Sequence, residues 1–291
     1  VENKYGSLDA FYDVIEIDLF TVLLPFPFKD YVSGQDGTIM TGRGSIAVET
    51  ITSDHFTDPD DPAIYDKLRH LIARRGDDRG ILAHTWGVLE AAYSFLGLQN
   101  TLMNLVQRPD EMNRLFGMIA DWSVQIAINS AKLGADIVQI SADSGASNGP
   151  LVNPATWRKL IYPHDKTIVD AIKQSGVIAA MHNDGNIWAF MDDIVEMGIE
   201  VLHPVQSSAG MDLAKVKQLY GDKITIHGGL DISHVLPSAT DEELVETIRH
   251  TMEVCKPGGG FIFQSEHFIP GNVSLSRLEL AYQTALEYSW Y

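Results

Sequence analysis

Cysteine is almost absent from this 291-residue chain, in which Cys255 is the single example. One cysteine excludes an internal disulfide and any metal site that is built from several thiolates. A chain without disulfides suits a reducing compartment, so we expect a cytoplasmic protein.

Basic residues and long apolar runs are scarce as well. The chain has 21 Lys plus Arg against 39 acids, which gives a formal net charge of −18. Because phosphate binding needs a basic face, this balance predicts no nucleic-acid partner. No stretch approaches the roughly 18 apolar residues of a membrane span, and no basic segment followed by an apolar one favours secretion. We therefore expect no membrane association.

Two common motifs are also missing. No G-x-G-x-x-G follows an apolar run, which disfavours a doubly wound dinucleotide fold, and Ser144 in SADSG lies outside a G-x-S-x-G elbow.

What the chain does contain is a regular alternation of short apolar runs with longer helical patterns. The apolar runs cover residues 81–86, 136–141, 177–182, 200–205, 223–228 and 260–265. The clearest helical patterns cover residues 108–134, 209–221 and 240–255.

Strands separated by helices imply a parallel sheet with right-handed crossovers. The number of units predicts a single (β/α)8 TIM barrel over residues 1–291, with clear repeats over 81–291. Within residues 1–80, the segment 14–20 is a candidate for a less visible strand, and 37–51 is typical of an inserted β-hairpin.

Polar residues gather where the apolar runs end, the place at which barrel enzymes assemble their active sites. Histidines and carboxylates dominate this set, whereas random placement would scatter them over helix surfaces. The set comprises His84, Trp86, Asp143, His182, Asp184, His203, Gln206, His227, Asp231, Glu266 and His267. Their convergence predicts a functional site.

The segment VIAAMHNDGNIW (177–188) allows three interpretations. His182 and Asp184, with a group from Glu266–His267, can hold a divalent metal, because zinc at catalytic sites takes three N or O ligands from protein. Alternatively, the acids and imidazoles bind substrate and transfer protons. In the third interpretation, Asp184 caps a following helix over 186–197 and His182 is hydrogen-bonded in the core.

Several longer segments resemble the uroporphyrinogen decarboxylase superfamily, which also contains barrel methyltransferases that act with methylcobamides. They cover residues 87–116, 134–164 and 181–206, followed in the C-terminal third by residues 211–237 and 258–280. The resemblance implies the barrel, with the first strand of the family missing or located before Val1. The Arg-rich R-Q-A-G-R segment and the F-D-[ST]-W run of the true decarboxylases are not present. The chain is therefore more similar to the methyltransferase members.

The zinc methyltransferases of this superfamily carry H-x-C on one strand and a cysteine on the last. Here the resemblance places His182 and Asp184 at the first motif and His267 at the second, with Glu266 beside it as a reserve ligand or general acid. Such N and O ligands make zinc a harder Lewis acid than thiolates do. Asp143, with His203, Gln206 and His227, is expected to line the substrate pocket, and His84, Trp86 and Asp231 are further candidates.

The resemblance implies a corrinoid-linked methyltransferase that acts on a small methylated compound or a thiol. The methylcobamide would be carried by a separate corrinoid protein, because no D-x-H-x-x-G occurs in this chain. Since related barrels are often dimers, a homodimer is also implied. The alternative is a metal-free decarboxylase, in which Asp143 or Asp184 stabilises a protonated intermediate and an imidazole donates the proton.

Overall fold

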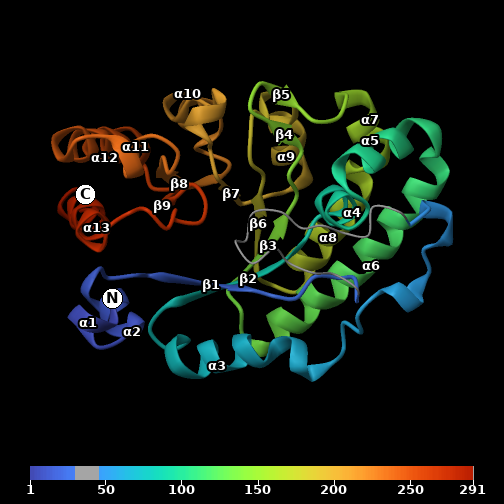
Figure 1. Ribbon diagram of the computed structural model, residues 1–291, viewed down its shortest axis with the longest axis horizontal. Coiled ribbons are helices and arrows are strands. Elements are labelled where there is room, and N and C mark those ends of the chain that lie inside the picture. The colour runs from blue at the N-terminus through green and yellow to red at the C-terminus, as the bar shows by residue number, and fades with distance from the viewer. Residues whose placement is uncertain (30–45, 291) are drawn as a thin grey trace.

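The computed structural model describes residues 1–29 and 46–290 of the chain. A curled sheet of seven parallel strands forms its centre, in the order β1-β2-β3-β6-β7-β8-β9 (Figure 1). The strands are β1 (Leu19–Leu23), β2 (Gly80–Trp86), β3 (Ile137–Ser141), β6 (Ile178–His182), β7 (Val201–His203), β8 (Thr225–Leu230) and β9 (Phe261–Ser265). The fold is an α/β barrel of the TIM type, as the alternation of strands and helices predicted.

Helices connect the strands and cover the outside of the sheet (Figure 1). The α-helices are α1 (Glu2–Tyr5), α2 (Leu8–Val14), α3 (Asp66–Arg75), α4 (Val88–Leu96), α5 (Leu98–Gln107), α6 (Pro109–Leu133), α7 (Pro154–Leu160), α8 (Tyr162–Gln174), α9 (Met191–Met197), α10 (Leu213–Tyr220), α11 (Val235–Ser238), α12 (Asp241–Cys255) and α13 (Leu275–Glu287). Short 3-10 turns are η1 (Val48–Thr50), η2 (Ser53–His55), η3 (Pro62–Tyr65), η4 (Trp188–Phe190) and η5 (Ser207–Ala209). Two residue pairs, β4 (Gly145–Ala146) and β5 (Gly149–Pro150), form a small antiparallel ladder.

The predicted strands and helices from residue 81 onward are confirmed, with small shifts at their ends. For example, α12 begins where the sequence indicated, because Thr240 and Glu243 form a capping box at its first turn. Within the described residues, no helix is both long enough and apolar enough to cross a bilayer.

Two predictions for the N-terminal part need comment. The strand expected over 14–20 is wrong in position: α2 continues to Val14, Glu16 adopts a positive φ of 50°, and the strand begins only at Leu19. A left-handed residue breaks the extended backbone that a strand starting at residue 14 would need. The hairpin expected over 37–51 lies largely outside the described residues, and its last part contains the 3-10 turn η1 rather than a strand.

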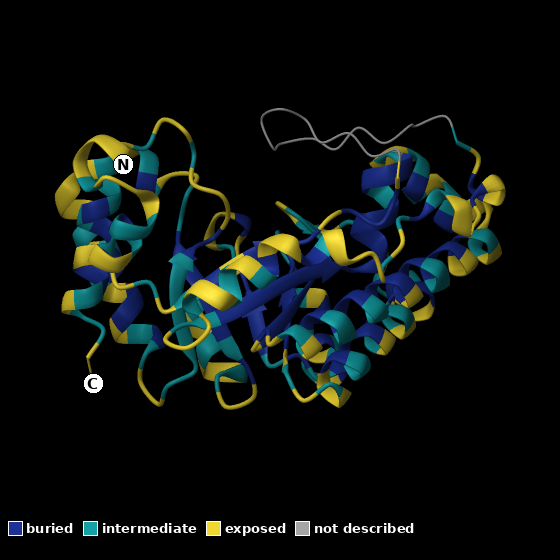
Figure 2. Ribbon diagram, turned by 90° about the horizontal axis from the view of Figure 1, so that it is seen from below, coloured by how far each residue is buried: buried dark blue, intermediate teal, exposed yellow. Residues whose placement is uncertain are grey.

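The two faces of the sheet differ in composition because side chains alternate along each strand. Residues such as Ala83, Ile140 and Met181 belong to the large apolar core under the helices. On the barrel's inner face, a small separate cluster of Leu82, Ile137, Ala180 and Val201 fills the lower part. Figure 2 shows the central strands, such as β3 and β7, as the most buried part of the molecule. Above the small cluster, the inner face carries polar side chains.

The edges of the sheet are β1 and β9, which do not pair with each other among the described residues. The first and last helices of the described chain lie close together beside these edges (Figure 1). Glu279 of α13 accepts hydrogen bonds from Lys4 and from the Tyr5 hydroxyl of α1, the latter at 2.7 Å. These contacts connect the two ends of the chain.

Candidate metal centre

A layer of imidazoles lies at the carboxyl ends of the neighbouring strands β6, β7 and β8. His182 and His203 are direct register partners, so their side chains project from the same face of the sheet. Their ring centroids are 5.1 Å apart, and those of His203 and His227 are 4.7 Å apart. Strand register alone therefore brings three histidines from separate parts of the sequence into contact.

The loops that follow β3 and β6 pack closely against each other at two glycines, Gly145 and Gly185. A Cβ added to Gly145 would lie 2.4 Å from the Asp184 carbonyl oxygen, and one at Gly185 would lie 2.6 Å from the carbonyl carbon of Gly145. This close approach allows the Asp184 backbone N–H to donate to Asp143 Oδ1 at 2.8 Å. The packing of the loops fixes two carboxylates beside each other.

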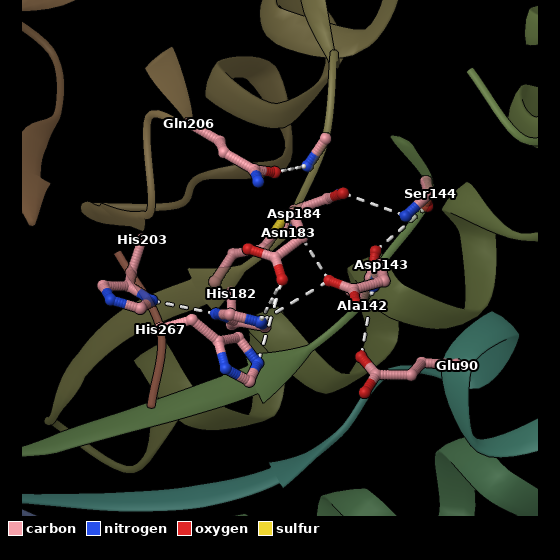
Figure 3. Close-up of polar contacts among 12 residues, drawn as sticks. Glu90, Ala142, Asp143, Ser144, His182, Asn183, Asp184, His203, Gln206 and His267 are labelled. Atoms are coloured by element: carbon pink, nitrogen blue, oxygen red, sulfur yellow. Dashed lines mark hydrogen bonds and ion pairs between the residues drawn. The ribbon is translucent and has the colours of Figure 1, made fainter. Parts of the chain in front are cut away.

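Ligand atoms from His182, Asp184 and His267 all lie within 4.8 Å of one another (Figure 3). Asp184 Oδ2 is 3.7 Å from His182 Nε2 and 3.8 Å from His267 Nε2. The exposed side-chain fraction rises from 11% for His182 to 29% for Asp184 and 41% for His267. The group thus runs from the barrel interior to the solvent, and its members are the three residues predicted as metal ligands.

The imidazoles behind this group are held by hydrogen bonds. His182 Nδ1 lies 2.8 Å from His203 Nδ1, and His203 Nε2 lies 3.2 Å from the Ser265 carbonyl oxygen. His227 Nε2 forms a hydrogen bond with the Gln264 side chain. Burial lowers the pKa of His203 well below its usual value, and burial lowers the pKa of His227 to about 4. Both rings are neutral at pH 7.

Carboxylates and a phenol occupy the opposite side of the group. Glu90 of α4 is buried and accepts a hydrogen bond from the Asp143 backbone N–H at 3.2 Å. Tyr93, one turn further along α4, has its hydroxyl 3.5 Å from Asp143 Oδ2. Burial raises the pKa of Glu90 far above its usual value, with a further contribution from the Asp143 charge, and burial also raises the pKa of Asp184.

Glu90 and Tyr93 are not among the site residues predicted from the sequence. One signal was available: in VLEAAYSFL (88–96), Glu90 is the lone charged residue of a helix that is otherwise apolar on most sides. A charged residue in such a helix has no polar face to occupy, so it lies in the interior beside a partner.

Two further predicted residues support the loops at the mouth of the barrel. Gln206 accepts a hydrogen bond from the Gly185 N–H at 2.7 Å, which holds the loop carrying Asp184 (Figure 3). Glu266 accepts one from the Ser207 N–H at 3.2 Å, while its other oxygen is buried without a partner. Burial raises the pKa of Glu266 to about 7. Glu266 lies next to His267 in sequence but outside the three-residue group.

The remaining predicted residues lie around this site rather than in it. His84 is buried on β2, and burial, with a smaller effect of His182, lowers its pKa to about 3. The Trp86 indole donates to the Pro25 carbonyl at 3.3 Å. Asp231 accepts from the backbone N–H groups of the turn that follows it, at 2.6 Å and 2.8 Å, and so has a local role.

The interpretation of Asp184 as a helix cap is wrong. The first two helical elements after β6 are η4, with Ile187 as its N-cap residue, and α9, with Phe190 as its N-cap residue. Neither is capped by a side-chain hydrogen bond. Gly185 has a positive φ of 86°, which turns the chain away before those turns begin. Asp184 consequently points toward the imidazoles. The other half of that interpretation is confirmed, because His182 is buried and hydrogen-bonded.

Comparisons with known proteins agree with this architecture. Residues 43–288 match the family model of uroporphyrinogen decarboxylase. A methyltransferase from Methanosarcina mazei has a similar structure, with a TM-score of 0.75 at 14% identity, covering 97% of this chain and 83% of that one. No curated protein matches by sequence.

Two more distant structures share the fold. A B12-independent methionine synthase from Shewanella sp. W3-18-1, solved with selenomethionine, has a TM-score of 0.54 at 13% identity, covering 78% of this chain and 66% of that one. A sugar phosphate isomerase/epimerase from Parabacteroides distasonis has a TM-score of 0.50 at 10% identity, covering 95% and 86%. At such low identities these likenesses show the fold alone.

Proposed function

The chain belongs to the uroporphyrinogen decarboxylase family, and on this basis we propose that it is a metal-dependent methyltransferase of that family. The observation that carries the proposal is the convergence of His182, Asp184 and His267 at the mouth of the barrel. The expected substrate is a small methylated compound or a thiol. The expected methyl carrier is a methylcobamide on a separate corrinoid protein.

The side chains fit a divalent metal, with zinc as the best match. Zinc at catalytic sites takes three protein ligands and leaves one position open. Asp143 Oδ1 and Asp184 Oδ2 are 3.6 Å and 3.7 Å from His182 Nε2, too far for a strong hydrogen bond. This nitrogen is therefore available to a metal. The exposure of His267 leaves a route from solvent.

With these ligands, zinc would supply Lewis acidity toward an oxygen or sulfur atom of the substrate. The protein contributes the positions of the groups around it. Asp143 holds the Asp184 backbone, and Gln206 holds the next residue of the same loop. With a pKa of about 7, Glu266 can hold a proton on its unbonded oxygen near neutral pH and act as a general acid.

The charge of the site disfavours the alternative, a metal-free decarboxylase. Its substrate is a carboxylate, which needs a cation to bind. Within the part of the chain that the structure describes, the ion-pair partners of Asp143 and Asp184 are histidines, with no lysine or arginine. These ion-pair partners thus offer an anionic substrate no lysine or arginine, whereas a metal cation would favour the ionised form of the carboxylates and bind them.

Elemental analysis tests the metal site. We expect close to one zinc per chain after purification without chelator, and loss of most of it in His182→Ala and in His267→Ala. His250→Ala is the control, because His250 is an exposed histidine on α12. Equal metal content in all four proteins would reject the ligand assignment.

A methyl-transfer assay tests the reaction itself. Free methylcobalamin and a panel of thiols are incubated with the zinc-loaded protein, and the loss of the methylcobalamin spectrum is followed. We expect transfer that depends on His182 and His267. A protein that holds zinc but leaves the methylcobalamin spectrum unchanged with every thiol would retain the metal centre and contradict methyl transfer to a thiol.

A further inference from the structure

His203 contacts the candidate metal centre from behind, and its two ring nitrogens have different partners. Nε2 lies 3.2 Å from the Ser265 carbonyl oxygen, and Nδ1 lies 2.8 Å from His182 Nδ1. The ring is 7% exposed, so water does not compete for these contacts. His203 of β7 thus contacts both β6 and β9. Its contact with His182 is drawn in Figure 3.

These contacts determine where the protons lie. A carbonyl oxygen can only accept, so His203 Nε2 must carry the proton that it donates to Ser265. A neutral imidazole has one N–H, so His203 Nδ1 has a free lone pair. His182 Nδ1 must then be the donor in the contact between the two rings. In the neutral form of His182, the lone pair then lies on its remaining nitrogen, Nε2.

His182 Nε2 is the atom that faces Asp184 and Asp143. A histidine binds a metal through an unprotonated nitrogen, and its tautomer is set by the hydrogen bond at its other nitrogen. We propose that His203 is a positioning residue that, anchored by the Ser265 carbonyl, fixes His182 in the tautomer able to bind a metal. This inference rests on the proposed metal centre for its purpose, but the tautomers can be observed without any metal.

The direct test is nitrogen-15 NMR of the metal-free protein with labelled histidines. In the wild type we expect His182 protonated on Nδ1 and His203 protonated on Nε2. In His203→Leu we expect His182 to show a mixture of tautomers. In His203→Asn, the amide oxygen replaces the Nδ1 acceptor, so the Nδ1–H form of His182 should return.

Cobalt(II) or zinc titration gives the second measurement. Removal of an outer hydrogen-bond partner of a ligand histidine typically weakens metal binding about 10- to 100-fold. We expect a loss of that size in His203→Leu and recovery of most of it in His203→Asn. His227→Leu is the matched control, because it removes a buried imidazole from the next strand that touches His203 but has no hydrogen bond to His182. This control should leave the His182 tautomer unchanged.

Each outcome separates the two proposals. The predicted tautomers in a protein that binds no metal would support the role of His203 and reject the metal centre. A wild-type His182 protonated on Nε2 would overturn the role of His203, even if zinc binds. An unchanged tautomer in His203→Leu would overturn it as well, as would equal losses of affinity in His203→Leu and His227→Leu.

Discussion

Two sides of the barrel mouth respond to burial in opposite ways. On the side of β3 and α4, burial raises the pKa of carboxyl groups such as Glu90. On the side of β7 and β8, burial lowers the pKa of imidazoles such as His203 and His227. The cause is the same, because a low-dielectric interior favours the neutral form of every group. A neutral carboxylic acid has lost the negative charge that attracts a metal. A neutral imidazole keeps an unprotonated nitrogen and can bind one.

The two sides meet at the candidate metal centre. Asp184 comes from the loop after β6 that packs against the acidic side, and its Oδ2 lies between His182 Nε2 at 3.7 Å and His267 Nε2 at 3.8 Å. A bound dication would favour the deprotonated carboxylate and the neutral imidazole, and so would lower the pKa of Asp184. We expect the metal to be the cation that balances a site otherwise rich in acids.

The largest stability change is expected for a buried carboxyl group, Asp165 of α8. This buried residue accepts a hydrogen bond from the Val88 N–H at the start of the helix that carries Glu90. Burial raises its pKa from 3.8 to about 7. Between these two pH values, Asp165 is protonated in the native state and ionised in the unfolded chain. Its contribution to stability is complete below pH 4 and disappears as the pH rises through 7.

Asp165→Asn mimics the protonated acid and removes this dependence. Between pH 4 and pH 8, we expect wild-type stability to fall relative to the variant by on the order of 4 kcal/mol, measured by urea unfolding. Asp170→Asn is the control on the same helix, because Asp170 is a half-buried residue paired with Lys166. Parallel stability profiles for wild type and Asp165→Asn would show that this carboxyl is not held neutral.

A buried imidazole should show the opposite dependence, and His84 of β2 is the residue to test. Its folded pKa of about 3 lies below the usual 6.5, so the unfolded chain takes up a proton first as the pH falls. The contribution to stability is complete above pH 6.5 and is lost toward pH 3. Between pH 7 and pH 4, the wild type should lose on the order of 3 kcal/mol relative to His84→Leu. His250→Leu serves as the exposed control. If His84→Leu and His250→Leu lose the same free energy of unfolding between pH 7 and pH 4, the proposed neutral state of His84 is wrong.

The strands and their polar ends could be predicted from the sequence because they depend on local patterns. The alternation of apolar runs and helices located β2, β3 and β6 to β9, and the triad of His182, Asp184 and His267 was predicted from strand ends together with a family resemblance. Both features depend on a residue's position in its own strand.

The partners across the strands could not be predicted in this way. The contact of His203 with His182 depends on the register of two strands, and its contact with Ser265 depends on the curvature of the sheet. Glu90 reaches the site because α4 packs over the end of β3. Its partner Asp143 is 53 residues away in the sequence, so no local pattern predicts the contact. His203 could accordingly be predicted as a pocket residue from the sequence, but its hydrogen bonds could not.

The smallest expected effect comes from separating the two sides at Gly145. A Cβ there meets the Asp184 carbonyl oxygen at 2.4 Å, so Gly145→Ala must push the β3 and β6 loops apart. Overpacking of this kind costs about 1 to 3 kcal/mol of stability. It should also break the contact of Asp143 with the Asp184 N–H and weaken metal binding. Gly271→Ala, with open space around the added methyl group, is the control. Because the contact between His182 and His203 joins the ends of β6 and β7 and not the displaced loops, His182 should keep its Nδ1 proton in Gly145→Ala. Loss of that tautomer would show that the two sides are not independent.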